Sequence, residues 1–195
     1  KTKDHCVNLE IIEILKGDYR LTQVVFHAEQ LLREGETYVL QIDSMPSYLG
    51  HFFKFNLDKD DYEGPVWKAE KLNKTQPKIT TTPKETGQEY ELLGCGPSIH
   101  KTFTLKYEGA PFTVFKTQVQ SIDSNTTTTY YLGIDSIGEI KVGKGMCSGA
   151  FKFTNGTKYL IRFSPYGFNN KPQAYWTEWV SFKRPKYKKL KLLWK

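Results

Sequence analysis

The chain has 195 residues, of which 38% are hydrophobic and 25% are charged, so it carries enough apolar material for a packed core. This composition excludes global disorder, and the lack of any apolar run of about 18 residues excludes a membrane-spanning helix. The formal net charge of +7 equals the charge of residues 183–195 alone, so residues 1–182 sum to zero. A neutral body argues against nucleic-acid binding, for which basic residues usually spread over the folded surface.

The first half of the chain contains few clear elements. Residues 7–15, VNLEIIEIL, fit either a helix or a strand, and residues 26–36, FHAEQLLREGE, are expected to hold a helical turn. The stretch LLREGETYVLQID then predicts a strand in which Tyr38 and every second residue after it share one face. HFFKFNL, at residues 51–57, is a further strand candidate because it is rich in aromatic residues.

Strand candidates are more numerous in the second half. KTFTLKY, FTVFKTQVQSI and TTTTYYLGID are rich in β-branched and aromatic residues, and turn signals such as YEGAP, DSN and VGKG separate them. The glycine-rich GKGMCSG is typical of a turn that links strands. KFTNGTKYLIRFS repeats the pattern around Tyr38, with Tyr159, Ile161 and Phe163 on one face. Both tyrosines follow a Gly turn, as in the tyrosine corner of β-sandwiches, so Tyr38 and Tyr159 are predicted to be such corners.

These patterns predict a mostly β fold with two β-sandwich units. The stretch NKTQPKITTTPKETGQ has no apolar period and marks the boundary between them. We expect a first unit at residues 1–75, a second at residues 76–185 and a basic tail at residues 186–195. The first unit is shorter than the roughly 100 residues of a complete sandwich. It is therefore truncated, unusual, or completed by something outside this chain.

Sequons and cysteines indicate an extracellular chain. No Cys/His spacing suggests zinc, and one disulfide with one odd cysteine is the simplest arrangement outside the cell. We predict that Cys95 pairs with Cys147, because both lie in the second unit, and that Cys6 is unpaired or bonded outside this chain. Closing that loop is expected to stabilise the unit by roughly 4 kcal/mol. Three reduced thiols in a cytosolic protein remain the alternative. The predicted glycosylation sites are Asn73, Asn125 and Asn155.

The chain has a tryptophan pair near its C-terminus, Trp176 and Trp179. Both rings can face the same side only if the backbone between them is not a strand. Residues three apart face opposite sides of a strand but the same side of a polyproline-II turn. Arg162 is expected to face outward on the strand that begins at Tyr159, so its guanidinium can stack between the two indoles. Such contacts contribute about 0.5–1 kcal/mol each at exposed sites. The three residues predict a structural clasp, and the competing interpretation is a ligand-contact patch.

Two family resemblances involve this region. YLIRFSPYGFNNKPQAYWTEWVSF resembles the end of a fibronectin type III domain, and its W-x-x-W resembles the W-S-x-W-S box of class I cytokine receptors, with Thr177 and Val180 in place of the serines. Residues 146–167, MCSGAFKFTNGTKYLIRFSPYG, are similar to a segment of receptor-type protein tyrosine phosphatases that reads roughly C-N-G-P-L-K-P-G-T-x-Y-R-F. Ser148 replaces the usual Asn of that segment, and residues 151–155 lack its two prolines.

The resemblance covers residues 112–185. It implies fibronectin type III-like (immunoglobulin-like) units, the first of them incomplete or atypical, in the extracellular, membrane-proximal segment of a single-pass receptor tyrosine phosphatase. The implied roles are spacing, adhesion, or binding of an extracellular protein ligand or cell-surface partner. The basic tail would then approach anionic lipid or glycosaminoglycan, or serve as a solvated stalk. A cytokine-receptor-like binding module and a secreted binding protein of a β fold are the alternatives.

The sequence shows no catalytic, cofactor-binding or metal-binding pattern. CGPSIHK, which starts at Cys95, lacks the arginine of the phosphatase signature. Neither G-x-S-x-G nor H-E-x-x-H occurs, and GKGMCSG is not a nucleotide-binding loop. We therefore expect this chain to have no enzymatic activity, no cofactor and no bound metal.

Overall fold

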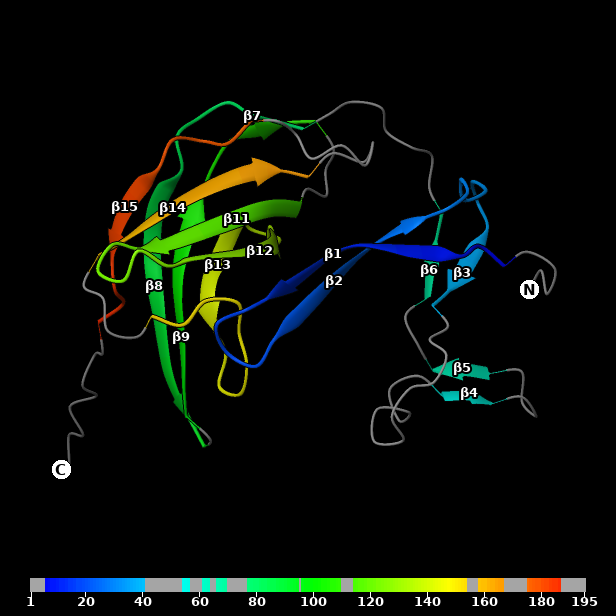
Figure 1. Ribbon diagram of the computed structural model, residues 1–195, viewed down its shortest axis with the longest axis horizontal. Helices are drawn as coiled ribbons and strands as arrows, with labels where there is room; N and C mark the ends of the chain where they lie inside the picture. Colours follow the sequence, from blue (N-terminus) through cyan, green and yellow to red (C-terminus); the bar gives the residue numbers. More distant parts are fainter. Residues whose placement is uncertain are drawn as a thin grey trace. The chain divides into compact units, whose positions relative to one another are not determined.

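The computed structural model of the chain describes residues 6–40, 54–56, 61–63, 66–69, 77–94, 96–109, 114–153, 158–166 and 175–186 (Figure 1). All regular elements in these ranges are β-strands, so the predicted mostly β class is confirmed. No helix in the described ranges has the length and apolar character needed to cross a membrane. The chain divides into two compact units, one made of Lys1–Glu10 and His27–Leu72 and the other of Ile11–Phe26 and Asn73–Lys195.

The first unit contains two short antiparallel ladders. Strand β3 (Thr37–Val39) pairs with β6 (Val66–Lys68), and Tyr38 lies opposite Trp67. Strand β4 (Lys54–Asn56) pairs with β5 (Asp61–Glu63). Within the described residues of this unit the strands form no larger sheet. The HFFKFNL stretch does contain a strand, β4, as its aromatic content indicated.

A β-hairpin follows the N-terminus, made of β1 (Leu9–Lys16) and β2 (Thr22–Ala28). The ambiguous VNLEIIEIL stretch is therefore a strand, which suits its β-branched isoleucines. The helical turn expected within residues 26–36 is wrong, because β2 continues to Ala28 and residues 29–36 contain bends and a turn but no helix. A cross-strand hydrogen bond from the Glu29 amide to the Asn8 carbonyl, 3.0 Å long, lies just beyond the end of β2.

The second unit contains two antiparallel sheets. One has the order β13-β9-β8, and the other has the order β12-β11-β14-β15. A two-stranded ladder of β7 (Lys78–Ile79) and β10 (Tyr107–Glu108) accompanies them. The strands of the larger sheets are β8 (Lys84–Leu93), β9 (Gly96–Thr104), β11 (Val114–Ser121), β12 (Thr127–Gly133), β13 (Glu139–Lys144), β14 (Lys158–Pro165) and β15 (Val180–Lys183).

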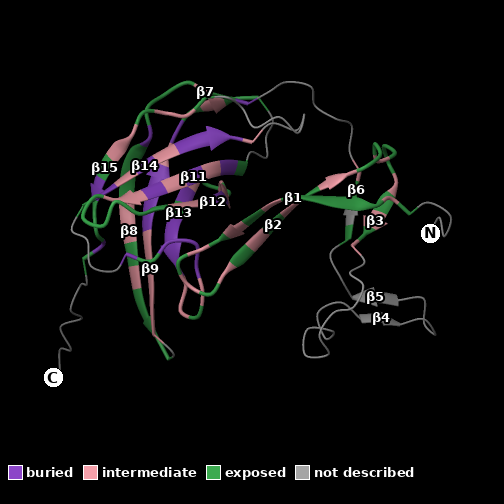
Figure 2. Ribbon diagram, viewed as in Figure 1, coloured by how far each residue is buried: buried purple, intermediate pink, exposed green. Residues whose placement is uncertain are grey.

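The core of the second unit lies between these two sheets, as Figure 2 shows by the buried strand surfaces. Phe103 of β9 lies 6.0 Å from Phe163 of β14 and 5.4 Å from Phe182 of β15, measured between ring centroids. Phe115 of β11 and Ile140 of β13 are fully buried in the same cluster. Side chains from both sheets thus interdigitate, which is consistent with a β-sandwich.

Period-two alternation explains which side chains enter this core. On β14 Tyr159, Ile161 and Phe163 are buried, whereas Arg162 between them is partly exposed, as the sequence predicted. On β11 Phe115, Thr117 and Val119 are buried, so the residues between them face the opposite side. The outer face of the four-stranded sheet therefore carries polar and charged side chains.

The glycine-rich segment GKGMCSG comprises the last two residues of β13 and the turn that follows them. The amide of Gly145 donates to the carbonyl of Ser148, which forms the strand-linking turn that the sequence predicted. At Gly143 a Cβ atom would lie only 2.0 Å from the carbonyl oxygen of Ile99, and at Gly149 it would lie 2.3 Å from Cα of Lys144. Neighbouring backbone passes so close that only glycine fits at either position.

The unit boundaries differ in two ways from those expected from composition. Part of the supposed linker is folded, because β7 and the first residues of β8 lie within it. Strand β8 is an edge strand whose side chains are mostly exposed, so it carries no apolar period. In addition, residues 11–26 belong to the second unit although they lie far upstream of it in the sequence.

Candidate binding surface on the four-stranded sheet

A row of polar side chains crosses the outer face of the four-stranded sheet. Gln118 of β11 lies opposite Thr129 of β12 on one side and opposite Arg162 of β14 on the other. Arg162 donates from Nε to Oε1 of Gln118 over 2.8 Å, and Gln118 donates from Nε2 to Oγ1 of Thr129 over 3.1 Å. The strand register thus places three residues in one hydrogen-bonded row and fixes the direction of the guanidinium.

The guanidinium of Arg162 also lies between the two tryptophans. Its Cζ atom is 4.6 Å from the ring centroid of Trp176 and 4.4 Å from that of Trp179, within the range of cation–π contacts. This is the arrangement expected from the sequence. We refer to Arg162, Trp176 and Trp179 as the Arg162 clasp.

The segment that carries the tryptophans is held on β14 by Thr177, one of the two residues between them. The Thr177 amide donates to the carbonyl of Phe163 over 2.9 Å, and the Phe163 amide donates to Oγ1 of Thr177 over 3.0 Å. Residues 175–179 have no regular secondary structure, which allows both indoles to reach Arg162 although they are three apart. Both rings are only partly buried, so the clasp remains part of the surface.

We expect Arg162→Ala to lower the free energy of unfolding by about 1–2 kcal/mol, because two cation–π contacts are lost. Arg162→Lys should recover little, since a compact ammonium cannot stack as a planar guanidinium does. Urea unfolding of both variants measures the effect, with Glu178→Ala as the control, because Glu178 lies between the tryptophans but is exposed. Unchanged midpoints for Arg162→Ala and Trp176→Ala would contradict a structural clasp and favour the ligand-contact interpretation.

The neighbouring row on the same face is contacted by the N-terminal hairpin. Lys116 of β11 forms an ion pair with Glu13 of β1, with 2.6 Å between Nζ and Oε1. The hydroxyl of Tyr131, opposite Lys116 on β12, donates to the other oxygen of Glu13 over 2.9 Å. Burial and the contact with Glu13 raise the pKa of Tyr131 well above its usual value. These contacts attach β1 to the sheet.

Two more side chains of residues 11–26 hold the hairpin in place. The side-chain amide of Gln23 on β2 forms two hydrogen bonds with the backbone of Tyr131. Its Oε1 atom accepts from the Tyr131 amide over 2.8 Å, and its Nε2 atom donates to the Tyr131 carbonyl over 3.2 Å. Asp18, in the hairpin turn, accepts hydrogen bonds from Oγ1 of Thr128 and from the amide of Lys152. No local pattern marks Glu13, Asp18 or Gln23 in the sequence, because their partners lie more than 100 residues away.

The structure describes the preceding loop for the first predicted tyrosine corner, Tyr38, but not for the second, Tyr159. The Tyr38 hydroxyl accepts a hydrogen bond of 2.9 Å from the Arg33 amide, five residues upstream, as a tyrosine corner requires. The ring of Tyr159 is buried, stacks on Phe182 at 5.5 Å between centroids and contacts Phe153 edge-on. It therefore covers one end of the core, whereas the loop at residues 154–157 lies outside the described residues.

One of the three predicted glycosylation sites lies in the described part of the chain. Asn125 is exposed in the turn between β11 and β12, with a left-handed backbone (φ 53°) that Asn tolerates better than most residues. Its Oδ1 atom accepts from Nε2 of Gln120 over 2.8 Å. The exposed position suits a glycan acceptor. Asn73 and Asn155 lie outside the described residues.

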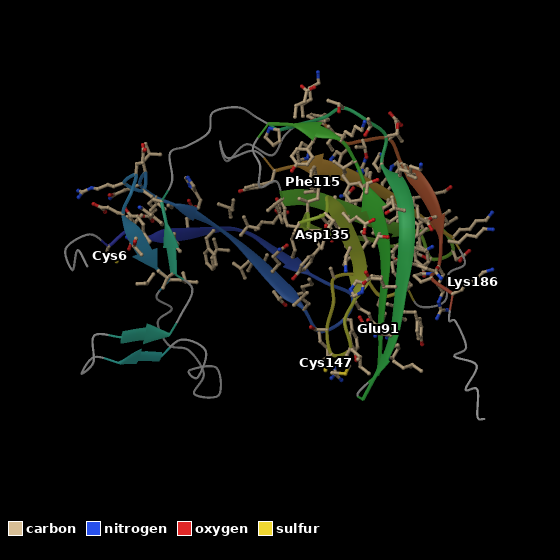
Figure 3. The ribbon with its side chains drawn as sticks, turned by 180° about the vertical axis from the view of Figure 1, so that it is seen from behind. Cys6, Glu91, Phe115, Asp135, Cys147 and Lys186 are labelled. Carbon is tan, nitrogen blue, oxygen red and sulfur yellow. The ribbon has the colours of Figure 1, made fainter. Side chains whose placement is uncertain are left out.

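Two of the three cysteines, Cys6 and Cys147, are described, and both are free and exposed in the structure. Cys95 lies outside the described residues, so the Cys95–Cys147 disulfide stays a prediction. The flanking chain nevertheless brings the two segments together. A Cβ atom on Gly96, next to Cys95, would lie 3.8 Å from the carbonyl oxygen of Met146, next to Cys147 (Figure 3 labels Cys147).

For protein made under oxidising conditions, we expect mass mapping without reduction to yield a peptide that links Cys95 to Cys147. The proximity of their chain neighbours is the physical reason, since a disulfide forms only where the Cα atoms approach within about 7 Å. Cys6 should be recovered as a free thiol or as an adduct. A peptide that links Cys6 to either of the others would refute this pairing.

The described residues hold no metal-binding cluster, and those that follow Cys95 do not form a phosphate-cradling loop. In the described ranges, no group of three or more His, Cys, Asp or Glu side chains is placed to hold a metal ion. Residues 96–101, which follow Cys95, lie in strand β9 and are extended. A phosphate-cradling loop needs successive backbone amides that converge on one point, and an extended strand does not provide them.

Comparisons with protein-family models, with curated proteins and with solved structures find no match to this chain.

Proposed function

We propose that this chain is a non-catalytic extracellular module of a cell-surface receptor, of the receptor tyrosine phosphatase type, with fibronectin type III-like architecture. It acts in spacing and in binding an extracellular protein or cell-surface partner, while any dephosphorylation belongs to another part of the receptor. The observation that carries this proposal is the Arg162 clasp. It joins two features of the sequence resemblances: the alternating strand after Tyr159, part of which lies in the segment similar to receptor tyrosine phosphatases, and the W-x-x-W pair, which resembles the box of class I cytokine receptors.

Three further observations support the proposal. Two antiparallel sheets that face each other over an aromatic core are the architecture that fibronectin type III domains share with other sandwiches. Asn125 is exposed in a turn, where a glycan of an extracellular protein can be attached. The outer face of the four-stranded sheet offers Trp and Arg side chains, which are favoured at binding interfaces.

Cell-surface location and glycosylation test the proposal directly. The full-length gene product, expressed in animal cells, should be labelled by a membrane-impermeant biotin reagent and should lose mass on treatment with N-glycosidase. Asn125→Gln should remove one glycan, whereas Asn8→Gln, in an exposed position outside any sequon, should remove none. An unglycosylated chain that stays in the cytosol would refute an extracellular role.

The alternatives predict that different segments accompany this chain in the full-length gene product. A receptor phosphatase has a membrane-spanning stretch and a phosphatase domain in the same polypeptide, a cytokine-receptor-like module has the first only, and a secreted binding protein has neither. The purified chain itself should not hydrolyse aryl phosphates. Hydrolysis that Cys95→Ser abolishes would overturn the non-catalytic assignment.

A further inference from the structure

A groove with a strongly positive lining lies at one end of the second unit, between the edge strand β8 and strand β15. Its volume is about 610 Å³. Among the described residues that line it, five have cationic side chains and one has a carboxylate. We call this feature the basic groove, and its charged lining consists of Glu85, Lys101, Lys158, Lys183, Arg184 and Lys186.

Two of its lysines lie directly opposite each other on neighbouring strands. Lys158 of β14 and Lys183 of β15 are register partners, and both side chains are exposed. Like charges at directly opposite positions destabilise a β-ladder. Among the described residues neither lysine forms an ion pair that would offset the repulsion. An anion placed between the two ammonium groups would remove this repulsion.

The rest of the groove is held in place by specific bonds. Lys101 is almost fully buried at its base, and its Nζ atom lies 2.5 Å from Oε1 of Glu85, so the Glu85 carboxylate is already paired. Gln88 of β8 holds the backbone of Lys186, donating to its carbonyl over 3.4 Å and accepting from its amide over 3.3 Å (Figure 3 labels Lys186). The C-terminal segment is thus anchored at the groove as far as Lys186.

We propose that the basic groove binds a sulfated polysaccharide of the glycosaminoglycan class. Lysine ammonium groups are compact point charges that suit separate sulfate groups along a chain. Several exposed cations bind weakly to a single small anion in physiological salt, but they bind a polyanion strongly because it releases many counterions.

The lining favours a polysaccharide over the other polyanions. Single-stranded nucleic acid is bound by exposed aromatic rings on which its bases stack. Among the described residues that line the groove, Phe182 is the only aromatic one, and it is buried in the core. A lipid surface is contacted by side chains that protrude from the protein, whereas these cations line a groove, and a groove accommodates an extended chain. This partner deepens the proposed extracellular function and rests on it, because such polymers occur outside cells.

A heparin-derived octasaccharide, titrated against the intact purified chain at several salt concentrations, tests the proposal. The variant with both Lys158→Ala and Lys183→Ala should bind about tenfold more weakly, and the slope of log affinity against log salt should decrease by about two. Lys106→Ala, an exposed lysine in the same unit, is the matched control and should bind as the unchanged chain does. The desulfated octasaccharide should bind far more weakly to all three proteins.

The double variant removes a repulsive pair, so the midpoint of its urea unfolding should equal or exceed that of the unchanged chain. A loss of binding at an unchanged midpoint is then not caused by unfolding. Equal affinity of the double variant and the Lys106→Ala control would overturn the proposal, as would preferential binding to phosphatidylserine vesicles or to an oligonucleotide. Abolition of binding by Lys188→Gln, Lys189→Gln and Lys191→Gln alone, with the groove intact, would assign the site to the tail instead. Cell-surface location is measured separately, so failure of binding does not decide the proposed function.

Discussion

A fragment that begins at Pro77 and ends at Lys186 should unfold far more easily than the whole chain, by about 5 kcal/mol, or should fail to fold. It lacks residues 11–26, whose Leu15 and Leu21 pack against the core. Removing two such leucines costs about 3 kcal/mol, and the two hydrogen bonds of Gln23 add about 2 kcal/mol. A single domain has only about 5–15 kcal/mol in total. Urea unfolding followed by tryptophan fluorescence compares the two proteins.

A single substitution in the whole chain separates this effect from a general consequence of truncation. Gln23→Ala should lower the free energy of unfolding by about 1–3 kcal/mol, because the amide and carbonyl of Tyr131 lose their partner in a partly buried site. Thr22→Ala, the exposed neighbour on β2, is the control and should change the midpoint little. Equal stability of the fragment, the Gln23→Ala variant and the intact chain would show that the hairpin is not part of this domain.

Phe103→Ala should destabilise the second unit by about 3–5 kcal/mol, the range for deleting a buried phenyl ring. Phe103 is 0% exposed and contacts Phe163 and Phe182, so the cavity would open between the two sheets. Packing from both sides leaves little room for the surrounding chain to collapse into it. Thermal and urea unfolding both report the loss.

Leu92→Ala on the edge strand β8 is the matched comparison. Leu92 is also a large hydrophobic residue, but it is 56% exposed. We expect its effect to be within about 0.5 kcal/mol. A similar loss for both variants would mean that the space between the sheets is not the main core of this unit.

The chain passes between the two units three times, at residues 10/11, 26/27 and 72/73. A boundary drawn at a single linker would therefore cut residues 11–26 off from the second unit, to which they belong. For the proposed receptor function this means that binding experiments need the whole chain, because the hairpin contacts Lys116 and Tyr131 on the same outer face that carries the Arg162 clasp.

The sequence by itself determined the features that depend on neighbouring residues. Alternation of apolar residues after Tyr159 predicted β14 and its inward side chains, because side-chain direction in a strand repeats every two residues. The same rule placed Arg162 outward. The non-strand spacing of Trp176 and Trp179 then predicted a backbone that lets both rings reach it. Glycine spacing likewise predicted the turn after β13, where a side chain would meet neighbouring backbone.

Only the tertiary structure decided which distant segments share a surface. Glu13, Asp18 and Gln23 belong to the second unit because their carboxylates and amide find partners on β11 and β12 and at Lys152. The basic groove likewise arises where β8, β9, β14 and β15 bring lysines together from positions 101, 158 and 183. These contacts close loops of many residues, and no local propensity or period records them. Their existence depends on the packing of two whole sheets around one core.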